Sequence, residues 1–159
     1  MLEGHSDLIT TIHFSLDGIY IVTGSRDTTL KLWNIKKGSL MHTYRGHSTE
    51  VISAKISPTK RLILSSSKDN DLIVWDLSSR TELAKKNYGD EVVELCIDDK
   101  EKYVVISFSK EHFISVVQIS NLETVHTLYG HKSKIISINF DLFYRKLISL
   151  SKDKTVKIW

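Results

Sequence analysis

Three tryptophans occur in this chain of 159 residues, and all of them fall on one grid. Trp33, Trp75 and Trp159 are separated by 42 and by 84 positions, so a single period of 42 residues accounts for their placement. The grid point without a tryptophan is Val117. A fixed period of this length indicates one small unit repeated along the chain, each copy burying its apolar surface against its neighbours. The sequence therefore predicts a repeat array.

A glycine followed by a polar residue opens every unit. Counting back 27 or 28 positions from the four grid points finds His5, His47, Asp90 and His131, each preceded by glycine. Four repeats, at approximately residues 4–45, 46–88, 89–129 and 130–159, then account for residues 1–159.

Each unit consists of short apolar segments separated by turn residues. In the first unit the candidate strands are residues 9–14, 19–25, 30–35 and 40–44. The pattern recurs at residues 51–56, 61–67, 72–77 and 82–85, whereas the fourth unit has only residues 135–140, 146–151 and 155–159. Apolar residues on both faces of the second strand indicate a sheet that is covered on both sides. We therefore predict stacked four-stranded antiparallel meanders, the last of which lacks its outer strand.

These features together resemble the WD40-repeat β-propeller family over essentially every residue. The motifs that carry the resemblance are the Gly-His pairs, Trp33-Asn34, Trp75-Asp76, and the Ser-x-Asp turns that end at Asp27, Asp69 and Asp153. The resemblance implies an all-β fold, a partial propeller of four blades. Propellers commonly have about 4 to 8 blades, and most WD40 rings resemble the larger end. We therefore expect an open array that another chain, a second copy or further repeats must complete.

The resemblance also implies a polar set in each complete blade, in which a histidine lies between the turn aspartate and a strand hydroxyl that meets the tryptophan indole. The expected sets are His5, Thr23, Asp27 and Trp33; His47, Ser65, Asp69 and Trp75; and His131, Ser149, Asp153 and Trp159. The alternative is a Ser-His-Asp catalytic arrangement. Catalysis needs an exposed nucleophile beside an oxyanion hole, whereas these hydroxyls are expected to be consumed inside the blade. We therefore predict structural staples, no catalytic residues, and no metal or other cofactor, because the seven histidines lack metal-ligand spacing.

The third unit departs from this pattern. Asp90 replaces the histidine, Glu111 replaces the turn aspartate and Val117 replaces the tryptophan. Of the polar set, only the strand hydroxyl remains, at Ser107. Two neighbouring carboxylates are expected to repel each other. The blade is then held by apolar packing of Val104, Val105, Ile106, Val116 and Ile119. Simple divergence and local adaptation to a partner both remain open.

One rim of the array is predicted to bind partners. The residues expected just before the turn acid are all basic: Arg26, Lys68, Lys110 and Lys152. Similarity to the family adds Leu8, Thr10, Glu50, Ile52, Glu91, Val93, Lys134 and Ile136 at the start of the innermost strands. Such a rim suits an acidic peptide or a phosphate-bearing segment. Nucleic acid is a weaker alternative, since the net charge is only +3 and no aromatic platform accompanies the lysines. For any single residue, a solvated lysine remains the other alternative.

The most economical function is a non-catalytic protein-interaction scaffold within a multiprotein complex. No apolar run approaches ~18 residues and no signal peptide is recognisable, so a membrane partner is not expected. The lone Cys96 fits a reducing compartment, and we expect an intracellular protein of the nucleus, nucleolus or cytoplasm.

Two phrases, residues 67–76 and 128–132, resemble those of a large tandem-propeller WD40 protein of the small-subunit processome. That resemblance implies architectural support of ribosome biogenesis. The alternatives are an RNA-contacting subunit, or a substrate receptor in a ubiquitin ligase. Ligase docking in the family uses an arginine two residues after Trp-Asp, where this chain has Ser78.

Overall fold

The computed structural model describes residues 2–141 and 146–159, which form fifteen β-strands. The first sheet contains β1 (Ile9–Phe14), β2 (Tyr20–Ser25), β3 (Leu30–Asn34) and β4 (Ser39–Tyr44). The second contains β5 (Val51–Ile56), β6 (Leu62–Ser67), β7 (Asp71–Asp76) and β8 (Glu82–Asn87). The third contains β9 (Val92–Ile97), β10 (Tyr103–Phe108), β11 (Ile114–Gln118) and β12 (Glu123–Leu128). The fourth contains β13 (Ile135–Asp141), β14 (Lys146–Ser151) and β15 (Val156–Ile158).

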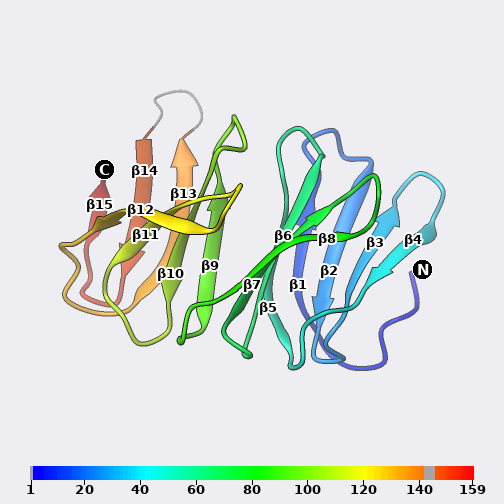
Figure 1. Ribbon diagram of the computed structural model, residues 1–159, viewed down its shortest axis with the longest axis horizontal. Coiled ribbons are helices and arrows are strands. Elements are labelled where there is room, and N and C mark those ends of the chain that lie inside the picture. The colour runs from blue at the N-terminus through cyan, green and yellow to red at the C-terminus, as the bar shows by residue number, and fades with distance from the viewer. Residues whose placement is uncertain (1, 142–145) are drawn as a thin grey trace.

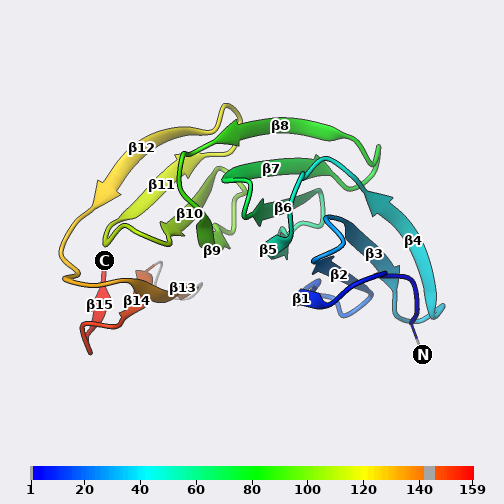
Figure 2. The ribbon, with the colours of Figure 1, turned by 90° about the horizontal axis from the view of Figure 1, so that it is seen from below.

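Every sheet is an antiparallel meander whose strands pair in chain order. Three sheets have four strands, and the fourth has three among the residues described. The predicted fold class, a partial propeller with an incomplete last blade, is therefore confirmed. The four blades stand side by side in Figure 1. Figure 2 shows them following one another round an open arc, with β1, β5, β9 and β13 on the concave side and β4, β8 and β12 on the convex side.

Apolar side chains fill the spaces between consecutive blades. Val22 and Leu32 of the first blade form one buried cluster with Val51 and Ile63 of the second. A second cluster joins the second and third blades, and a third cluster joins the third and fourth. At Gly24 the first blade meets the second so closely that an added Cβ would lie 2.5 Å from Val51 Cγ1. The core therefore lies between sheets, as the apolar character of both strand faces predicted.

The third blade is displaced from the 42-residue grid by one residue over its first two strands. In blades one, two and four, the amide next to the turn donates to a carbonyl of the innermost strand or the loop before it: Arg26 to Leu8, Lys68 to Glu50, and Lys152 to Lys134. The corresponding bond in the third blade runs from Ser109 to Glu91, an offset of 41 residues from the second blade. In contrast, Val117 pairs with Val104 as Trp75 pairs with Ile63, so the third strand keeps the offset of 42 residues. Residues of β9 and β10 therefore correspond to residues 41 positions earlier in the second blade, and not 42 positions earlier as the grid assumes.

Candidate functional site

One polar site is the set of four side chains inside the second blade. His47 Nε2 lies 2.9 Å from Ser65 Oγ, and the Trp75 indole N–H donates to that same oxygen at 2.9 Å. On the other side of the imidazole, His47 Nδ1 lies 3.2 Å from an oxygen of Asp69. The predicted members thus form one continuous chain from tryptophan to aspartate.

The first and fourth blades contain the same chain of hydrogen bonds. His5 contacts Asp27 at 2.8 Å and Thr23 at 2.7 Å, and Trp33 donates to Thr23 at 2.9 Å. His131 contacts Asp153 at 2.9 Å and Ser149 at 2.7 Å, and Trp159 donates to Ser149 at 2.9 Å. The structure therefore brings together all twelve side chains that the sequence grouped.

One proton arrangement satisfies every atom in such a chain. The hydroxyl oxygen accepts from the indole and donates its own proton to imidazole Nε2, while Nδ1–H donates to the carboxylate. A serine in this arrangement has no free proton for a substrate, and Ser65 and Ser149 are fully buried. A catalytic serine must reach its substrate. These oxygens are enclosed by the blade instead.

The carboxylates are held ionised by several donors. Burial alone would raise the pKa of Asp27, but hydrogen bonds from the Thr29 hydroxyl, the Ser6 amide and His5 outweigh it and lower the pKa below its usual range. Asp69 shows the same balance, with a pKa lowered chiefly by backbone amides. For His47, burial is the dominant cause and lowers the imidazole pKa, although Asp69 opposes that shift. In the second blade, the surroundings thus favour a neutral His47 and an ionised Asp69.

The turn that follows each aspartate contains a feature that the sequence analysis missed. Thr28, Asn70 and Lys154 all adopt positive φ angles, of 70°, 67° and 67°. Glycine and asparagine tolerate this region, whereas a β-branched residue is strained there. Only the asparagine offered a sequence signal. The preceding serine fixes the turn, since Ser25 Oγ accepts from the Asp27 amide at 3.0 Å.

In the third blade, the displaced register changes the predicted assignments. In the other blades, the histidine lies three residues before the carbonyl that accepts from the turn amide, the carbonyl of Leu8, Glu50 or Lys134. In the third blade that carbonyl belongs to Glu91, so the residue at the histidine position is Tyr88 and not Asp90. The position of the strand hydroxyl belongs to Ile106, which lies in one buried cluster with Val117. Ser107 faces the opposite way, and no described residue bonds its buried Oγ. The assignment of Ser107 as the remaining member of the set was therefore wrong.

The expected repulsion between Asp90 and Glu111 was also wrong. Asp90 accepts hydrogen bonds from Ser109 Oγ at 2.7 Å and from the Lys110 amide at 2.9 Å. Burial would raise its pKa, but these donors lower it. Glu111 is exposed. The five apolar side chains predicted to hold this blade are buried or half-buried, and they are divided between its two faces.

The predicted basic rim is partly neutralised. Glu50 lies between two of its members, with its oxygens 3.3 Å from Arg26 Nε and 2.6 Å from Lys68 Nζ. The hydrogen bond and charge of Glu50 raise the pKa of Lys68. Lys110 stands one position beyond the equivalent of Arg26, where the structure has Ser109. The grid alignment that placed Lys110 in a ring of four equivalent basic residues was therefore wrong.

The other predicted rim residues differ in exposure. Leu8 and Ile136 are exposed, whereas Ile52, Val93 and Glu91 are half-buried. Thr10 serves the fold itself, because its hydroxyl lies within hydrogen-bonding distance of the Gly24 and Val51 carbonyls.

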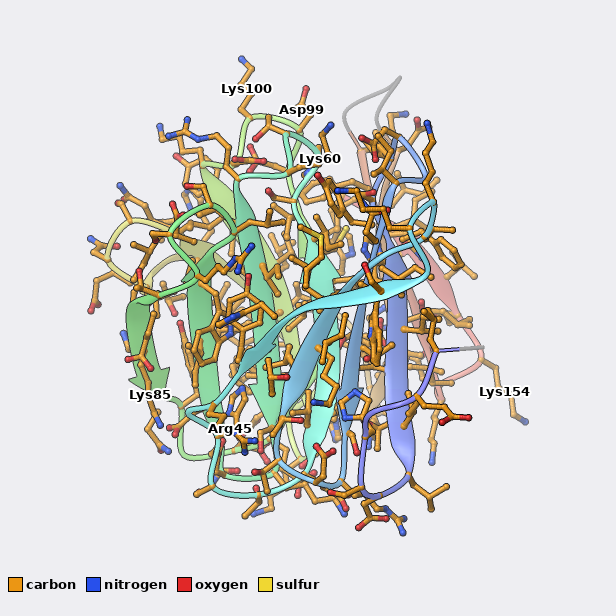
Figure 3. The ribbon with its side chains drawn as sticks, turned by 90° about the vertical axis from the view of Figure 1, so that its right-hand side faces the viewer. Arg45, Lys60, Lys85, Asp99, Lys100 and Lys154 are labelled. Carbon is orange, nitrogen blue, oxygen red and sulfur yellow. The ribbon has the colours of Figure 1, made fainter. Side chains whose placement is uncertain are left out.

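Positive charge collects instead on the fourth blade. Four lysines, named here the fourth-blade basic cluster, occupy its two rim loops: Lys132, Lys134, Lys152 and Lys154. The loops are joined by the bond from the Lys152 amide to the Lys134 carbonyl, 2.9 Å, and by the bond from the Lys132 amide to Asp153, 2.8 Å. Within residues 2–141 and 146–159, no carboxylate forms an ion pair with these four ammonium groups. Figure 3 labels Lys154 on the lower part of the molecule, away from Lys60 and Lys100 at the upper end.

Two hollows lie elsewhere in the part of the chain that the structure describes. A cavity of about 440 Å³ between the third and fourth blades is lined by Tyr103, Leu128, Phe140 and Trp159, among others. A smaller one of about 280 Å³ on the concave side contains Cys96, whose thiol is half-buried and has a pKa raised by burial. No group of three or more His, Cys, Asp or Glu side chains gathers into a metal site among the described residues.

The meandering blades and the repeated Trp-hydroxyl-His-Asp chain define a WD-repeat β-propeller array. The chain belongs to the NWD2 C-terminal β-propeller family, whose model matches residues 1–157.

Comparison with individual proteins gives relatives of the same class. The chain is 33% identical over 164 residues to a periodic tryptophan protein 2 homolog of Caenorhabditis elegans, and 28% identical over 161 residues to that of Dictyostelium discoideum. It is 30% identical over 156 residues to human WD repeat-containing protein 88. These alignments cover 97–99% of this chain but only 17%, 18% and 33% of the respective relatives. The chain thus spans about a sixth to a third of the length of these proteins.

The described residues include no helix with the length and apolarity needed to cross a membrane.

Proposed function

We propose that this chain is a non-catalytic scaffold that holds protein partners within a larger complex, and that an acidic or phosphorylated segment binds the fourth-blade basic cluster. The observation that carries the proposal is the uneven distribution of charge along the rim. Arg26 and Lys68 share Glu50, whereas the four lysines of the fourth blade have no described acidic partner. An ammonium group without an intramolecular ion pair is available to a carboxylate or a phosphate on another molecule.

The buried staples support a structural role for the remaining polar residues. Their hydroxyls and imidazoles are already bonded to each other, so they offer no exposed acid, base or nucleophile. Rigid blades hold the rim loops in fixed positions, which is the usual arrangement for binding residues on a scaffold.

The finer assignment that we propose is architectural support of small-subunit ribosome assembly, in the nucleus or nucleolus. Similarity to two periodic tryptophan protein 2 homologs supports it, together with the phrases at residues 67–76 and 128–132. The competing assignment is an adaptor in another complex, such as a ubiquitin ligase. At the position where ligase docking needs arginine, Ser78 instead bonds Asp76 through its amide and its hydroxyl.

A binding measurement tests the charge proposal. A fluorescein-labelled peptide of alternating glutamate and phosphoserine would be titrated with the chain, and its anisotropy followed. The Lys134→Glu, Lys152→Glu variant is expected to bind about tenfold more weakly or worse, since it reverses two charges at the site. Lys36→Glu, Lys37→Glu, in the turn between β3 and β4, is the matched control and should bind as the unaltered chain does. Equal weakening in both variants would reduce the effect to net charge and overturn the proposed site.

The cellular assignment is tested by affinity capture from native cell extract with the unaltered chain and the Lys134→Glu, Lys152→Glu variant. Small-subunit assembly factors recovered only with the unaltered chain would support both proposals. Recovery of a ubiquitin-ligase adaptor in their place would overturn the assignment to ribosome assembly.

A further inference from the structure

Aromatic side chains replace polar ones along the rim of the third blade. Four rings, named here the third-blade aromatic row, follow one another with centroids 5.9, 5.6 and 5.6 Å apart: Tyr88, Phe108, Phe113 and Tyr129. Tyr88 lies at the position of the histidine, and Phe108 lies at the position of the turn serine, which is Ser67 in the second blade. The row runs from the blade interior, where Phe108 is 5% exposed, to the solvent at Tyr129.

The last two rings of the row take the place of a polar pair. In the second blade, Asp71 of β7 pairs with Asn87 of β8, and the Asn87 amide donates to the Asp71 carboxylate at 2.7 Å. Phe113 and Tyr129 occupy these two positions in the third blade, as the pairing of the adjacent residues in β11 and β12 shows. A hydrogen-bonded polar pair is thus exchanged for a contact between two rings, 5.6 Å apart.

Tyr129 remains open to solvent although Phe113 lies against it. Its exposed fraction is 73%, larger than that of any other aromatic side chain among the described residues. The corresponding residues Arg45 and Asn87 are also exposed, and each is followed by a complete four-stranded blade. The exposure of Tyr129 therefore belongs to its position and does not depend on the number of strands in the blade that follows. A ring held by a second ring offers a rigid apolar contact to another molecule.

A rigid loop joins Tyr129 to Lys132. Gly130 lies so close to the Trp159 indole that an added Cβ would be 3.3 Å from its ring. His131 is buried, and both of its ring nitrogens are bonded inside the fourth blade. The Lys132 amide donates to the turn aspartate of the same blade at 2.8 Å. An exposed ring and an exposed ammonium group are thus held at most about 10 Å apart along the backbone.

We propose that Tyr129 and Lys132 together recognise an acidic segment of a partner protein that carries an aromatic residue close to its acidic ones. The site rests on the proposed function, because Lys132 belongs to the fourth-blade basic cluster. The partner's ring packs on Tyr129, and a carboxylate or phosphate beside it pairs with Lys132. In an extended segment, side chains two residues apart lie on one face, about 7 Å from each other, which fits the spacing of the loop. The rigid loop favours binding because little order is lost when the segment docks.

Single-stranded RNA is the less favoured occupant of this surface. Proteins that bind single strands stack successive bases on several exposed rings. In the third-blade aromatic row, Phe108 is buried, Tyr88 and Phe113 are half-buried, and only Tyr129 is exposed. One exposed ring beside one ammonium group matches a short segment with a single aromatic anchor.

Anisotropy titrations with two labelled peptides of equal charge test the proposed site. Both peptides alternate glutamate and phosphoserine, and they differ only at one central position, which is serine in one and phenylalanine in the other. The unaltered chain should bind the phenylalanine peptide about tenfold more tightly, because the added ring is buried against Tyr129.

Three variants locate the contact. Tyr129→Ser should remove the tenfold preference, whereas Tyr129→Phe should keep it, because the ring is retained. Leu83→Ser is the matched control and should also keep the preference, since Leu83 is 56% exposed but lies on the outer strand β8. Urea denaturation of Tyr129→Ser verifies that the variant is folded.

The outcomes separate this site from the proposed function. Equal affinity of the unaltered chain for the two peptides would overturn the aromatic contact and leave the acidic-segment proposal standing. If neither peptide binds, the proposed function fails, and the aromatic contact fails with it. A Tyr129→Ser variant that still prefers the phenylalanine peptide would show that the ring binds elsewhere. A labelled oligouridine that binds more tightly than either peptide, and loses that affinity in Tyr129→Ser, would assign the surface to single-stranded RNA instead.

Discussion

The Trp75 indole nitrogen lies 2.9 Å from Ser65 Oγ, and both residues are buried between the first two blades. The neighbouring Ser66 is equally buried, yet its Oγ has no hydrogen-bond partner among the described residues. Two adjacent serines of the same strand thus have opposite hydrogen-bonding states. The difference follows from strand geometry, because successive side chains point to opposite faces of the sheet. Only one face carries the tryptophan and the histidine.

This contrast predicts different costs for the same substitution. Ser65→Ala should lower the free energy of unfolding by about 2 kcal/mol, because it leaves a buried indole N–H and an imidazole nitrogen unsatisfied. Ser66→Ala should change it by no more than about 0.5 kcal/mol, since no bond is lost. Urea denaturation of the two variants measures both values. Equal losses would show that Ser65 stabilises the blade only by packing.

The third blade provides a test of its displaced register. Ile106→Ala should destabilise the chain by about 2–4 kcal/mol, because Ile106 is fully buried in the cluster that joins the second and third blades. Ser107→Ala should be neutral or slightly stabilising, since the Ser107 hydroxyl is buried without a described partner. Thermal and chemical unfolding would compare the two variants. A large loss for Ser107→Ala would restore Ser107 to the hydroxyl position that the 42-residue grid assigns to it.

Stability should fall in two stages as the solution becomes acidic. The pKa of His47 is lowered from 6.5, so the folded protein resists protonation of that imidazole. The stability that the neutral imidazole provides is therefore fully present above pH 6.5 and is lost as the pH falls below that value. The pKa values of Asp27, Asp69 and Asp153 are lowered from 3.8, so their contributions are present above pH 3.8 and are lost as the pH falls further.

Unfolding free energies measured against pH would show these two limbs. His47→Gln should reduce the slope of the limb below pH 6.5, whereas the rest of that limb should persist because burial also lowers the pKa values of His13 and His42. His126→Gln, which replaces an exposed histidine, is the control. A flat profile between pH 6.5 and the carboxylate range in the unaltered chain would contradict the account of a neutral, buried His47.

A strained turn residue predicts a stabilising substitution. Thr28 adopts a φ angle of 70°, and the second blade has Asn70 at the same position with a φ angle of 67°. Thr28→Asn should raise the free energy of unfolding by about 0.5–1 kcal/mol, because asparagine tolerates the left-handed region better than a β-branched residue does. Thr29→Ala is the contrasting variant, since it removes the 2.6 Å bond to Asp27 and should destabilise the chain. Thermal unfolding would detect the two opposite shifts.

The strands were predicted from apolar segments and turn residues, and the three polar sets from the resemblance to the WD40 family. In each set the hydroxyl residue stands 10 residues before the tryptophan and 18 residues after the histidine, so the same spacing recurs in three blades. The third blade could not be predicted in this way. Gly89-Asp90 imitates the opening of a unit, while the backbone bond from Ser109 to Glu91 shows that β10 is offset by one residue. Counting positions between tryptophans cannot detect a one-residue shift in β9 and β10, because the 42-residue spacing is restored by Val117 in β11.

The charge distribution on the rim could not be predicted from the sequence either. Arg26, Glu50 and Lys68 come from different loops, and only the packing of the first two blades brings both cations onto one carboxylate. The sequence therefore predicted four equivalent basic residues, whereas the structure separates a neutralised pair from the fourth-blade lysines, which have no acidic partner among the described residues.

The central claim, that the polar sets stabilise the blades, is tested most directly by a double-mutant cycle on Ser65 and Trp75. The measurement is the free energy of unfolding of Ser65→Ala, Trp75→Phe and the double variant. We predict a coupling energy of about 1 kcal/mol, because each single change removes the same hydrogen bond. Strictly additive losses would contradict the claim, since they would mean that the 2.9 Å contact contributes nothing to stability.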